Sequence, residues 1–440
     1  MEDKLHQKIK MKYFIQKFDK NIDKYKFMDK NQIKSLIKLQ KSNYSLDRQF
    51  YVDEIIFKLD LENFFFKQWI FVGHVSRIPN IGDYFLLNIG NESIIIIRDP
   101  NNIIHAHYNV CRHRGSQICL KDEGNKKLLV CPYHAWSYKI DGTLNSARLM
   151  NSNFNKEEWN LHGCNIKVYE GLIFINFSKE PVSFDEFIEP NKPFIELHGL
   201  KDAKIAYRKI YPTYGNWKLT LDNFHECYHC QPSHPEYCSV HDSEYIMSHG
   251  TGYGEGSHTE KYSKRLAEWN EKTKKLGYLT GEYSERNFNN FSRGAQRNPL
   301  SRGTLSETKS GKPASKKLMG KFKEHDYGYT GIGTSPFNSF MMCNDFATLV
   351  TFIPKSPLQT DVEIMWLVHK DAEEGKDYNL EDMIWLWDKT TIADKRIIED
   401  NQKGVLSSKY QPGPLSTMEL GLESFKNWYL KTSYLALDKN

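Results

Sequence analysis

The chain has 440 residues and a formal net charge of +5, which is small for its length. This length allows two or three domains with sizeable cores, and the weak charge gives no reason to expect a nucleic-acid partner. No apolar stretch approaches the roughly 18 residues that span a bilayer, so no membrane association is predicted. The first residues lack a basic segment followed by an apolar core, and the eight cysteines form no secretory framework. We therefore expect a cytoplasmic protein.

Residues 1–48 contain many lysines, interrupted by Asp19, Asp23 and Asp29. Alternating charges of this kind are typical of a solvated helical face. We expect the segment to be a helical extension that packs on the domain formed by the C-terminal part of the chain.

Residues 49–185 have the pattern of a β-domain. Apolar and β-branched runs at 84–87, 93–97, 103–107 and 171–176 predict strands, and Gly90-Asn91 and Asp141-Gly142 predict turns between them. Short strands with regular turn signals favour a β-sandwich.

Two runs in this segment combine cysteine with histidine. Cys111 and His113 form a Cys-x-His pair, and Cys131 and His134 form a Cys-x-x-His pair. A Rieske [2Fe-2S] cluster uses two thiolates on one iron and two imidazoles on the other. Two Cys and two His also suit tetrahedral zinc, but zinc fingers usually take two thiolates from one knuckle. The pattern therefore favours a Rieske cluster at two loop tips.

Residues 186–440 mix helices with strands. Apolar runs at 348–353 and 363–368 predict sheet strands, and residues 378–404 predict one long helix. Residues 240–330 are polar with few strand signals, so we expect an insertion of helices plus a mobile loop from Arg293 to Lys317 that covers the pocket entrance as a lid.

The run from Leu221 to Pro235 carries a second set of candidate metal ligands. His229 and His234 can supply two imidazoles to one ion from a helix end and the following turn. A carboxylate would complete the ligand set of non-haem Fe(II) oxygenases, but spacing alone does not select it. Cys227 and Cys230 flank His229 and could be a redox dithiol or half of a zinc site. We interpret them as small buried apolar side chains near the iron.

These motifs together resemble a known family. The two knuckles, followed by Glu-Cys-Tyr-His-Cys-x-x-x-His-Pro, resemble the oxygenase (alpha) subunit of Rieske non-haem iron oxygenases. The chain is most similar to glycine betaine oxygenases and to the related carnitine and choline monooxygenases, through segments at 216–219, 317–320, 368–372 and 410–414. The resemblance implies an α+β protein: a Rieske β-sandwich domain (49–185) and a helix-grip, START-like catalytic domain (186–440) with an antiparallel sheet and helices.

The resemblance also implies roles for individual residues. Asp394 is the implied third ligand of the mononuclear Fe(II), with Glu399 and Asp400 as alternatives. Glu226 is implied to bridge His134 of one subunit to His229 of the next, which requires a homotrimer. Asn223, in the same motif, is taken as a further catalytic residue.

The implied reaction uses O2 and electrons that a ferredoxin-type flavin/[2Fe-2S] reductase takes from NAD(P)H. It hydroxylates an N-methyl group of a quaternary ammonium, foremost glycine betaine, to give dimethylglycine and formaldehyde. Carnitine, choline or stachydrine, aromatic-ring dihydroxylation and a pure Rieske electron carrier stay open as alternatives. A quaternary ammonium favours aromatic faces, and a carboxylate needs a cation or an amide. The candidate pocket residues are Phe224, Tyr228, Phe337, Asn338, Phe340, Asn344 and Phe346, with His225 as a further candidate for the carboxylate.

Overall fold

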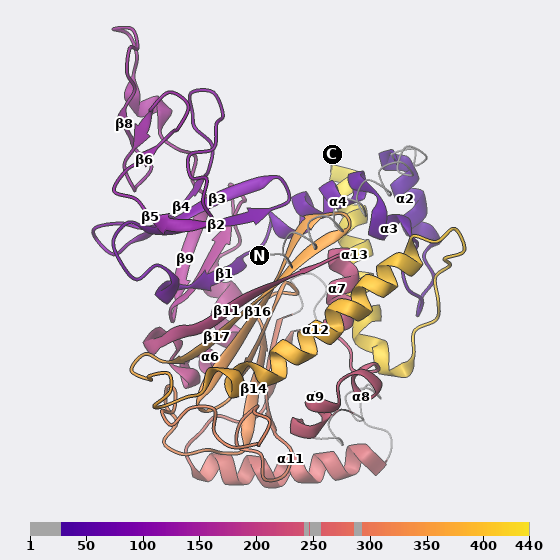
Figure 1. Ribbon diagram of the computed structural model, residues 1–440. Coiled ribbons are helices and arrows are strands. Elements are labelled where there is room, and N and C mark those ends of the chain that lie inside the picture. The colour runs from indigo at the N-terminus through magenta and orange to yellow at the C-terminus, as the bar shows by residue number, and fades with distance from the viewer. Residues whose placement is uncertain (1–27, 242–245, 247–256, 286–292, 440) are drawn as a thin grey trace, which may run out of the picture.

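The computed structural model describes residues 28–241, 246, 257–285 and 293–439 (Figure 1). The lysine-rich residues 1–27, predicted to form a helical face, lie outside this part of the chain. The helices are α2 (Lys30–Leu39), α3 (Gln49–Val52), α4 (Glu54–Asp60), α5 (Phe184–Ile188), α6 (Lys192–His198), α7 (Trp217–Phe224), α8 (Cys230–Ser233), α9 (Pro235–Val240), α11 (Ser257–Lys275), α12 (Leu380–Val405) and α13 (Leu420–Lys439). None of the helices described there combines the length and the apolar character that crossing a bilayer demands.

The predicted β-domain is present as three small antiparallel sheets. Their orders are β1-β10-β9, β4-β3-β2-β5 and β6-β7-β8. The strands are β1 (Ile70–His74), β2 (Asp83–Ile89), β3 (Glu92–Arg98), β4 (Ile104–Tyr108), β5 (Glu123–Asn125), β6 (Leu129–Val130), β7 (Ser137–Tyr138), β8 (Leu144–Ser146), β9 (Asn165–Tyr169) and β10 (Leu172–Asn176). The four runs predicted as strands correspond to β2, β3, β4 and β10.

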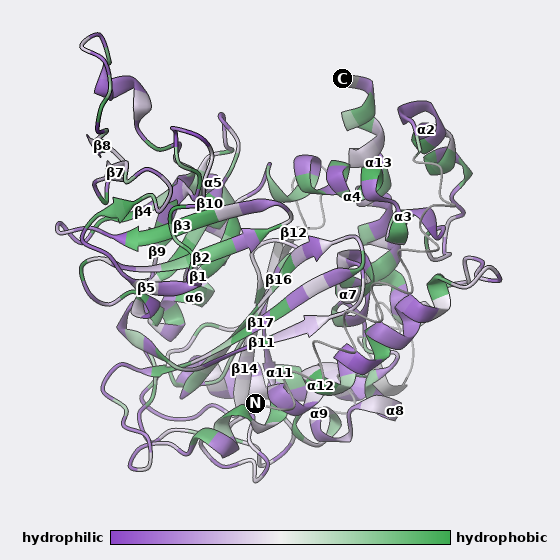
Figure 2. Ribbon diagram, turned by 45° about the horizontal axis from the view of Figure 1, so that its top comes forward, coloured by the Kyte–Doolittle hydropathy of each residue, from purple (hydrophilic) through white to green (hydrophobic). Residues whose placement is uncertain are grey.

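The strands described after residue 200 form a seven-stranded antiparallel sheet. Its order is β11-β17-β16-β15-β14-β13-β12. The strands are β11 (Ala203–Thr213), β12 (Glu282–Glu285), β13 (Arg293–Pro299), β14 (Gly328–Gly333), β15 (Asn338–Met342), β16 (Phe346–Ser356) and β17 (Gln359–His369). Hydrophobic residues fill much of β3 and β16, whereas α12 alternates between hydrophobic and hydrophilic residues (Figure 2). This arrangement confirms the predicted α+β class.

The long predicted helix is confirmed as α12. Its N-cap Asn379 accepts a hydrogen bond from the Asp382 backbone N–H, and two acidic residues lie in the first turn, where they interact favourably with the helix dipole. One face of the helix is buried, including Met383, Leu386 and Thr390, and this face continues to Asp394. Helix α12 packs on β11, α7 and α9, so it joins the sheet to the segment that carries His229 and His234.

The polar insertion differs from the prediction. Residues 293–299, predicted as the start of a mobile loop, form strand β13 and pair with β14. Arg297 on this strand is fully buried and makes a 2.8 Å ion pair with buried Asp326. Strand β13 was missed because it contains Arg, Gly, Gln and Asn and lacks the apolar alternation that predicts a strand. The following residues Ser306, Glu307 and Thr308 are also buried, so this stretch is not an exposed lid.

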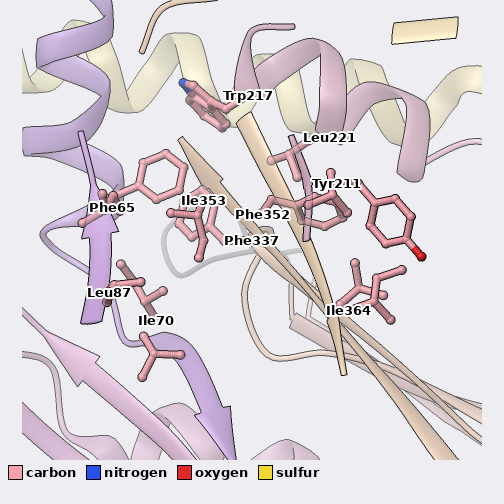
Figure 3. Packing of buried hydrophobic residues seen from close by; sticks show 14 of the residues in the cluster. Phe65, Ile70, Leu87, Tyr211, Trp217, Leu221, Phe337, Phe352, Ile353 and Ile364 are labelled. Carbon is pink, nitrogen blue, oxygen red and sulfur yellow. The ribbon is translucent and has the colours of Figure 1, made fainter. Parts of the chain in front are cut away.

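The main hydrophobic core lies between the large sheet and helices α7, α12 and α13. Figure 3 shows Trp217 and Leu221 of α7 facing Phe337, Phe352 and Ile364 on the sheet side. A second core covers the opposite face of the sheet, where β10, α5 and α6 pack. Because α7 is held by the main core, the metal-binding segment that follows it begins from a fixed position.

A buried charge links the N-terminal helices to the main core. Asp60, at the end of α4, accepts hydrogen bonds from the Trp217 indole N–H (2.9 Å), the Tyr429 hydroxyl (2.8 Å) and the Lys218 ammonium group. Asp60 and Lys218 are both buried, and losing either partner of such a pair would leave an uncompensated charge. Helix α2 packs on α13 nearby.

Candidate metal centres

His229, His234 and Asp394 come together from three elements. Their ligand atoms all lie within 4.8 Å of one another. Nε2 of His234 is 2.8 Å from Oδ1 of Asp394, and Nε2 of His229 is 3.3 Å from the same oxygen. Two imidazoles and one carboxylate are the donor set of mononuclear non-haem iron, and they leave positions open for O2 and substrate.

Helices α8, α9 and α12 position these three side chains. His229 precedes the short helix α8, and His234 lies between α8 and α9, where Pro235 begins the next helix. Asp394 lies on the buried face of α12, which packs against α9. Although burial alone would raise the pKa of Asp394, hydrogen bonds from His229 and His234 hold that pKa below its usual value. The site therefore favours a carboxylate anion, as a metal ligand must be.

Glu226 contacts the first of these histidines. Its Oε1 is 2.5 Å from Nδ1 of His229, and its Oε2 accepts the backbone N–H groups of Tyr228 and His229. Burial lowers the pKa of His229, but hydrogen bonds to Asp394 and Glu226 outweigh this effect and raise it to about 9. Asn223 also lies close, with Nδ2 3.3 Å from Nε2 of His229. Both residues singled out in the sequence thus lie against the iron site.

A second carboxylate beside the site was missed. Glu236 is 5 % exposed, and its Oε1 is 3.6 Å from Nδ1 of His234. The sequence offered one signal: an acidic residue two positions after the histidine, in the first turn of a new helix. Its burial and its contact with α12 were not visible from that spacing.

The alternative third ligands turn away from the site. The Glu399 carboxylate accepts a hydrogen bond from the Tyr214 backbone N–H and pairs with Lys395. Asp400 is exposed and pairs with Lys403 at 2.8 Å. The side chain that the helix directs toward the two histidines is Asp394.

The two cysteine–histidine knuckles lie at loop tips of the β-domain. Gly115 and Ala135 adopt positive φ angles of 76° and 59°, which let the chain turn back after each knuckle. Cys111 and Cys131 are buried, whereas His134 is exposed. The rings of His113 and His134 are 4.6 Å apart, so both imidazoles meet at one tip.

The donor atoms at this tip fit a [2Fe-2S] cluster. Nδ1 of His113 is buried and has no hydrogen-bond partner in the described part of the chain, as expected for an atom that binds a metal. The His113 ring stacks on Trp136 at 4.9 Å, and the Tyr138 hydroxyl is 3.3 Å from Sγ of Cys111. Two thiolates and two imidazoles are the Rieske donor set, and the hydroxyl is placed to hydrogen-bond a ligand sulfur.

The two centres of one chain are far apart. In Figure 1 the loops around β6 and β8 project at the upper left, whereas α8 and α9 lie at the lower right, across the large sheet. His134 is at the exposed tip, so it faces outward from its own chain.

The predicted state of Cys227 and Cys230 needs correction. The structure joins them in a disulfide, with Cα atoms 4.8 Å apart, instead of leaving two separate apolar side chains. Both pack in a small apolar cluster with Ile246 and Tyr262, where Cys230 is buried as expected and Cys227 is only half-buried.

Most of the predicted pocket residues have structural roles instead. Phe337 stacks on Phe65 at 4.0 Å, Phe340 packs on Phe71 at 4.9 Å, and Phe346 is buried in the main core. Sheet aromatics alternate between the two packed faces, which explains why these three face cores.

The polar candidates close turns. Asn338 donates hydrogen bonds to the hydroxyls of Thr334 (2.8 Å) and Ser335 (3.1 Å), and Asn344 accepts one from the Asp326 backbone N–H at 3.2 Å.

The remaining candidates lie on the metal-binding segment. Phe224 packs edge-on against Phe352 at 4.8 Å, and Tyr228 is 57 % exposed. Burial lowers the pKa of His225 to about 4, which leaves a neutral ring with no charge for a carboxylate.

An aromatic group that follows His234 in the chain escaped prediction. Tyr237 lies one turn after His234, and its ring is 4.1 Å from His241 and 6.1 Å from Trp387 of α12. The Trp387 indole donates a 2.6 Å hydrogen bond to fully buried Glu307, which also lies 3.2 Å from His241. These rings and the Glu307 carboxylate come from different elements, and only the fold reveals their proximity.

Family comparisons agree with both centres. The model of the Rieske [2Fe-2S] domain matches residues 68–169, and that of the ring hydroxylating alpha subunit (catalytic domain) matches residues 200–433. The chain is 34% identical over 400 residues, 90% of each chain, to the glycine betaine monooxygenase oxygenase subunit of Pseudomonas aeruginosa. It is 36% identical over 196 residues, 44% of this chain and 52% of the relative, to the carnitine monooxygenase oxygenase subunit of Escherichia coli K12.

Solved structures share the fold. The quaternary ammonium Rieske monooxygenase CntA with an inhibitor superposes with a TM-score of 0.67 at 22% identity, covering 92% of this chain and 99% of that one. Naphthalene 1,2-dioxygenase with indole bound gives a TM-score of 0.60 at 18% identity, covering 90% and 94%. With both family models matched and a relative 34% identical over 90% of each chain, the chain belongs to the Rieske non-haem iron oxygenases as an oxygenase (alpha) subunit.

Proposed function

We propose that this protein removes a methyl group from a quaternary ammonium compound, foremost glycine betaine, by hydroxylating an N-methyl carbon. Members of this family act on small molecules and take electrons from a reductase. The observation that carries the proposal is the 34% identity over 90% of both chains to a glycine betaine monooxygenase oxygenase subunit.

The reaction balances as follows. One oxygen atom of O2 enters a C–H bond of the N-methyl group, and two electrons and two protons reduce the other to water. The resulting N-hydroxymethyl group loses formaldehyde and a proton, which leaves dimethylglycine from glycine betaine. When bound, the iron supplies O2 activation and the [2Fe-2S] cluster supplies single electrons.

The protein's residues have distinct roles in this proposal. Cys111, His113, Cys131 and His134 would hold the cluster, and His229, His234 and Asp394 would hold the iron. Glu226 fixes the orientation of the His229 ring through Nδ1, as partners of metal-bound histidines commonly do.

Electron transfer is proposed to cross between subunits of a homotrimer. The large separation of the two candidate metal centres in one chain and the exposure of His134 support this arrangement. Glu226 would accept a hydrogen bond from His134 of the neighbouring subunit while it holds His229. A ferredoxin-type flavin/[2Fe-2S] reductase is the proposed NAD(P)H-dependent donor.

A quaternary ammonium has no N–H group, so it is attracted to aromatic faces. Tyr237, three residues after His234, packs against Trp387 of α12 and is the proposed aromatic contact for such a group.

Formaldehyde release tests the proposal. Iron-replete protein, a ferredoxin-type reductase, NADH and O2 would be incubated with glycine betaine, carnitine, choline, stachydrine or an aromatic acid. Formaldehyde with glycine betaine alone supports both reaction and substrate. Release with another ammonium keeps the reaction and replaces the substrate. Oxygenation of the aromatic acid without formaldehyde from any amine would overturn the proposal.

A further inference from the structure

His234 has a carboxylate partner of its own, distinct from Glu226. Nδ1 of His234 is buried and has no hydrogen-bond partner among the described residues, and Oε1 of Glu236 lies 3.6 Å from it. The side chains of both residues are 2 % exposed, so bulk water does not compete for either atom. A metal-bound imidazole usually donates its second N–H to a carboxylate or carbonyl, which fixes tautomer and ring direction.

Glu236 also contacts the helix that carries the third ligand. The Thr390 hydroxyl lies 3.5 Å from Oε1 of Glu236, and Nζ of Lys389 lies 3.7 Å from Oε2. Thr390 is four residues before Asp394, one turn along the same face of α12. The carboxylate therefore joins His234 to the helix of Asp394.

The two carboxylates differ in what they hold. Glu226 contacts His229 and the backbone of its own turn, and its side chain is 11% exposed. Glu236 is more deeply buried and links two of the elements that supply ligands. A buried carboxylate needs partners, and the groups around Glu236 are the His234 ring, a hydroxyl and one lysine.

We propose that Glu236 is a positioning residue of the mononuclear iron site: it accepts a hydrogen bond from Nδ1–H of His234 and thereby directs Nε2 to the iron. This role rests on the proposed ligands His229, His234 and Asp394, and it does not depend on which substrate the enzyme uses.

Fe(II) affinity tests this role without catalysis. The dissociation constant would be measured by competition with a chelator for the wild type, Glu236→Gln and the matched control Glu423→Gln. Glu423 is a buried carboxylate on α13, paired with Lys426. The Rieske absorption spectrum of each sample reports whether the fold and the cluster are intact.

Glu236→Gln should weaken Fe(II) binding by about 10- to 100-fold with unchanged cluster content. The Glu423→Gln control should bind Fe(II) as the wild type does. Wild-type affinity in Glu236→Gln, or equal weakening in both variants, would overturn the proposal. A wild-type protein that binds no iron beyond its cluster would instead refute the ligand assignment.

A second variant covers failure to fold. Glu236→Asp keeps the charge and withdraws it by one methylene, so it should weaken Fe(II) binding several-fold at normal cluster content. If Glu236→Gln does not fold, an Asp variant with wild-type Fe(II) affinity would overturn the proposal.

Discussion

His234 and Asp394 are 160 residues apart in the chain, yet Nε2 of one lies 2.8 Å from Oδ1 of the other. Glu399 and Asp400, the other acidic candidates on α12, make ion pairs with lysines instead. The buried face of α12 therefore selects Asp394 as the candidate third ligand of the iron.

Replacing Asp394 by Ala should therefore remove one iron per chain. Iron content should fall from about three to about two per chain, because the Rieske cluster retains its two irons. Metal analysis together with the Rieske spectrum measures this. Asp400→Ala is the matched control on the same helix, and loss of iron from that variant would argue for a different ligand.

Glu226→Gln should separate metal binding from electron transfer. Gln keeps the size of the side chain but removes the charge that holds Nδ1 of His229. With Fe(II) supplied in excess both metal centres should remain occupied, while reoxidation of a pre-reduced Rieske cluster by O2 and substrate slows by on the order of 100-fold. Stopped-flow absorbance follows that step. Glu381→Gln, at the exposed start of α12, should react at the wild-type rate; unimpaired transfer in Glu226→Gln would refute the bridging role.

Tyr138→Phe should lower the reduction potential of the Rieske cluster. The Tyr138 hydroxyl lies 3.3 Å from Sγ of Cys111, and hydrogen bonds to ligand sulfurs stabilise the reduced, more negative cluster. Redox titration followed by EPR measures the shift. The control is Tyr84→Phe, because Tyr84 lies in the same core and donates to the Lys121 carbonyl. An unchanged potential in Tyr138→Phe would contradict the assigned hydrogen bond.

Acid should destabilise the fold partly through His74. Burial lowers its pKa from 6.5 to about 4, and its Nε2 lies 2.9 Å from the Leu200 carbonyl oxygen. The unfolded chain binds the proton more tightly, so the stabilisation is complete above pH 6.5 and is lost as pH falls toward 4. Between pH 7 and pH 5 this residue should account for about 2 kcal/mol of lost unfolding free energy.

Urea unfolding of wild type and His74→Gln at both pH values measures that contribution. The variant should lose about 2 kcal/mol less than the wild type over this interval. Equal losses in the two proteins would mean that His74 does not titrate on unfolding as its burial implies.

The structure brings the candidate iron ligands together but places predicted pocket residues such as Phe340 in a packed core. The candidates His229 and His234 lie in one short motif, so spacing alone predicted their proximity. The pocket candidate Phe340 failed because one residue of register decides which face of a strand points to which core. Glu236 was missed because its contact with Thr390 joins residues 154 positions apart.

Strand β13 was missed for a related reason. Its polar residues are stabilised by the buried pair of Arg297 with Asp326, which belongs to a different part of the sequence. Hydrophobic periodicity does not detect a strand whose polar residues are stabilised by a charge pair.

The separation of the Rieske tip from α8 and α9 has a consequence that genetic complementation can reveal (Figure 1). If each working unit combines the cluster of one chain with the iron of its neighbour, two chains with different inactivating substitutions can complement each other. Co-expressed Cys111→Ser and Asp394→Ala chains should regain part of the activity that each lacks alone, since a mixed assembly contains intact cluster–iron pairs. A strain carrying one defective allele of each kind could then grow where either single mutant fails.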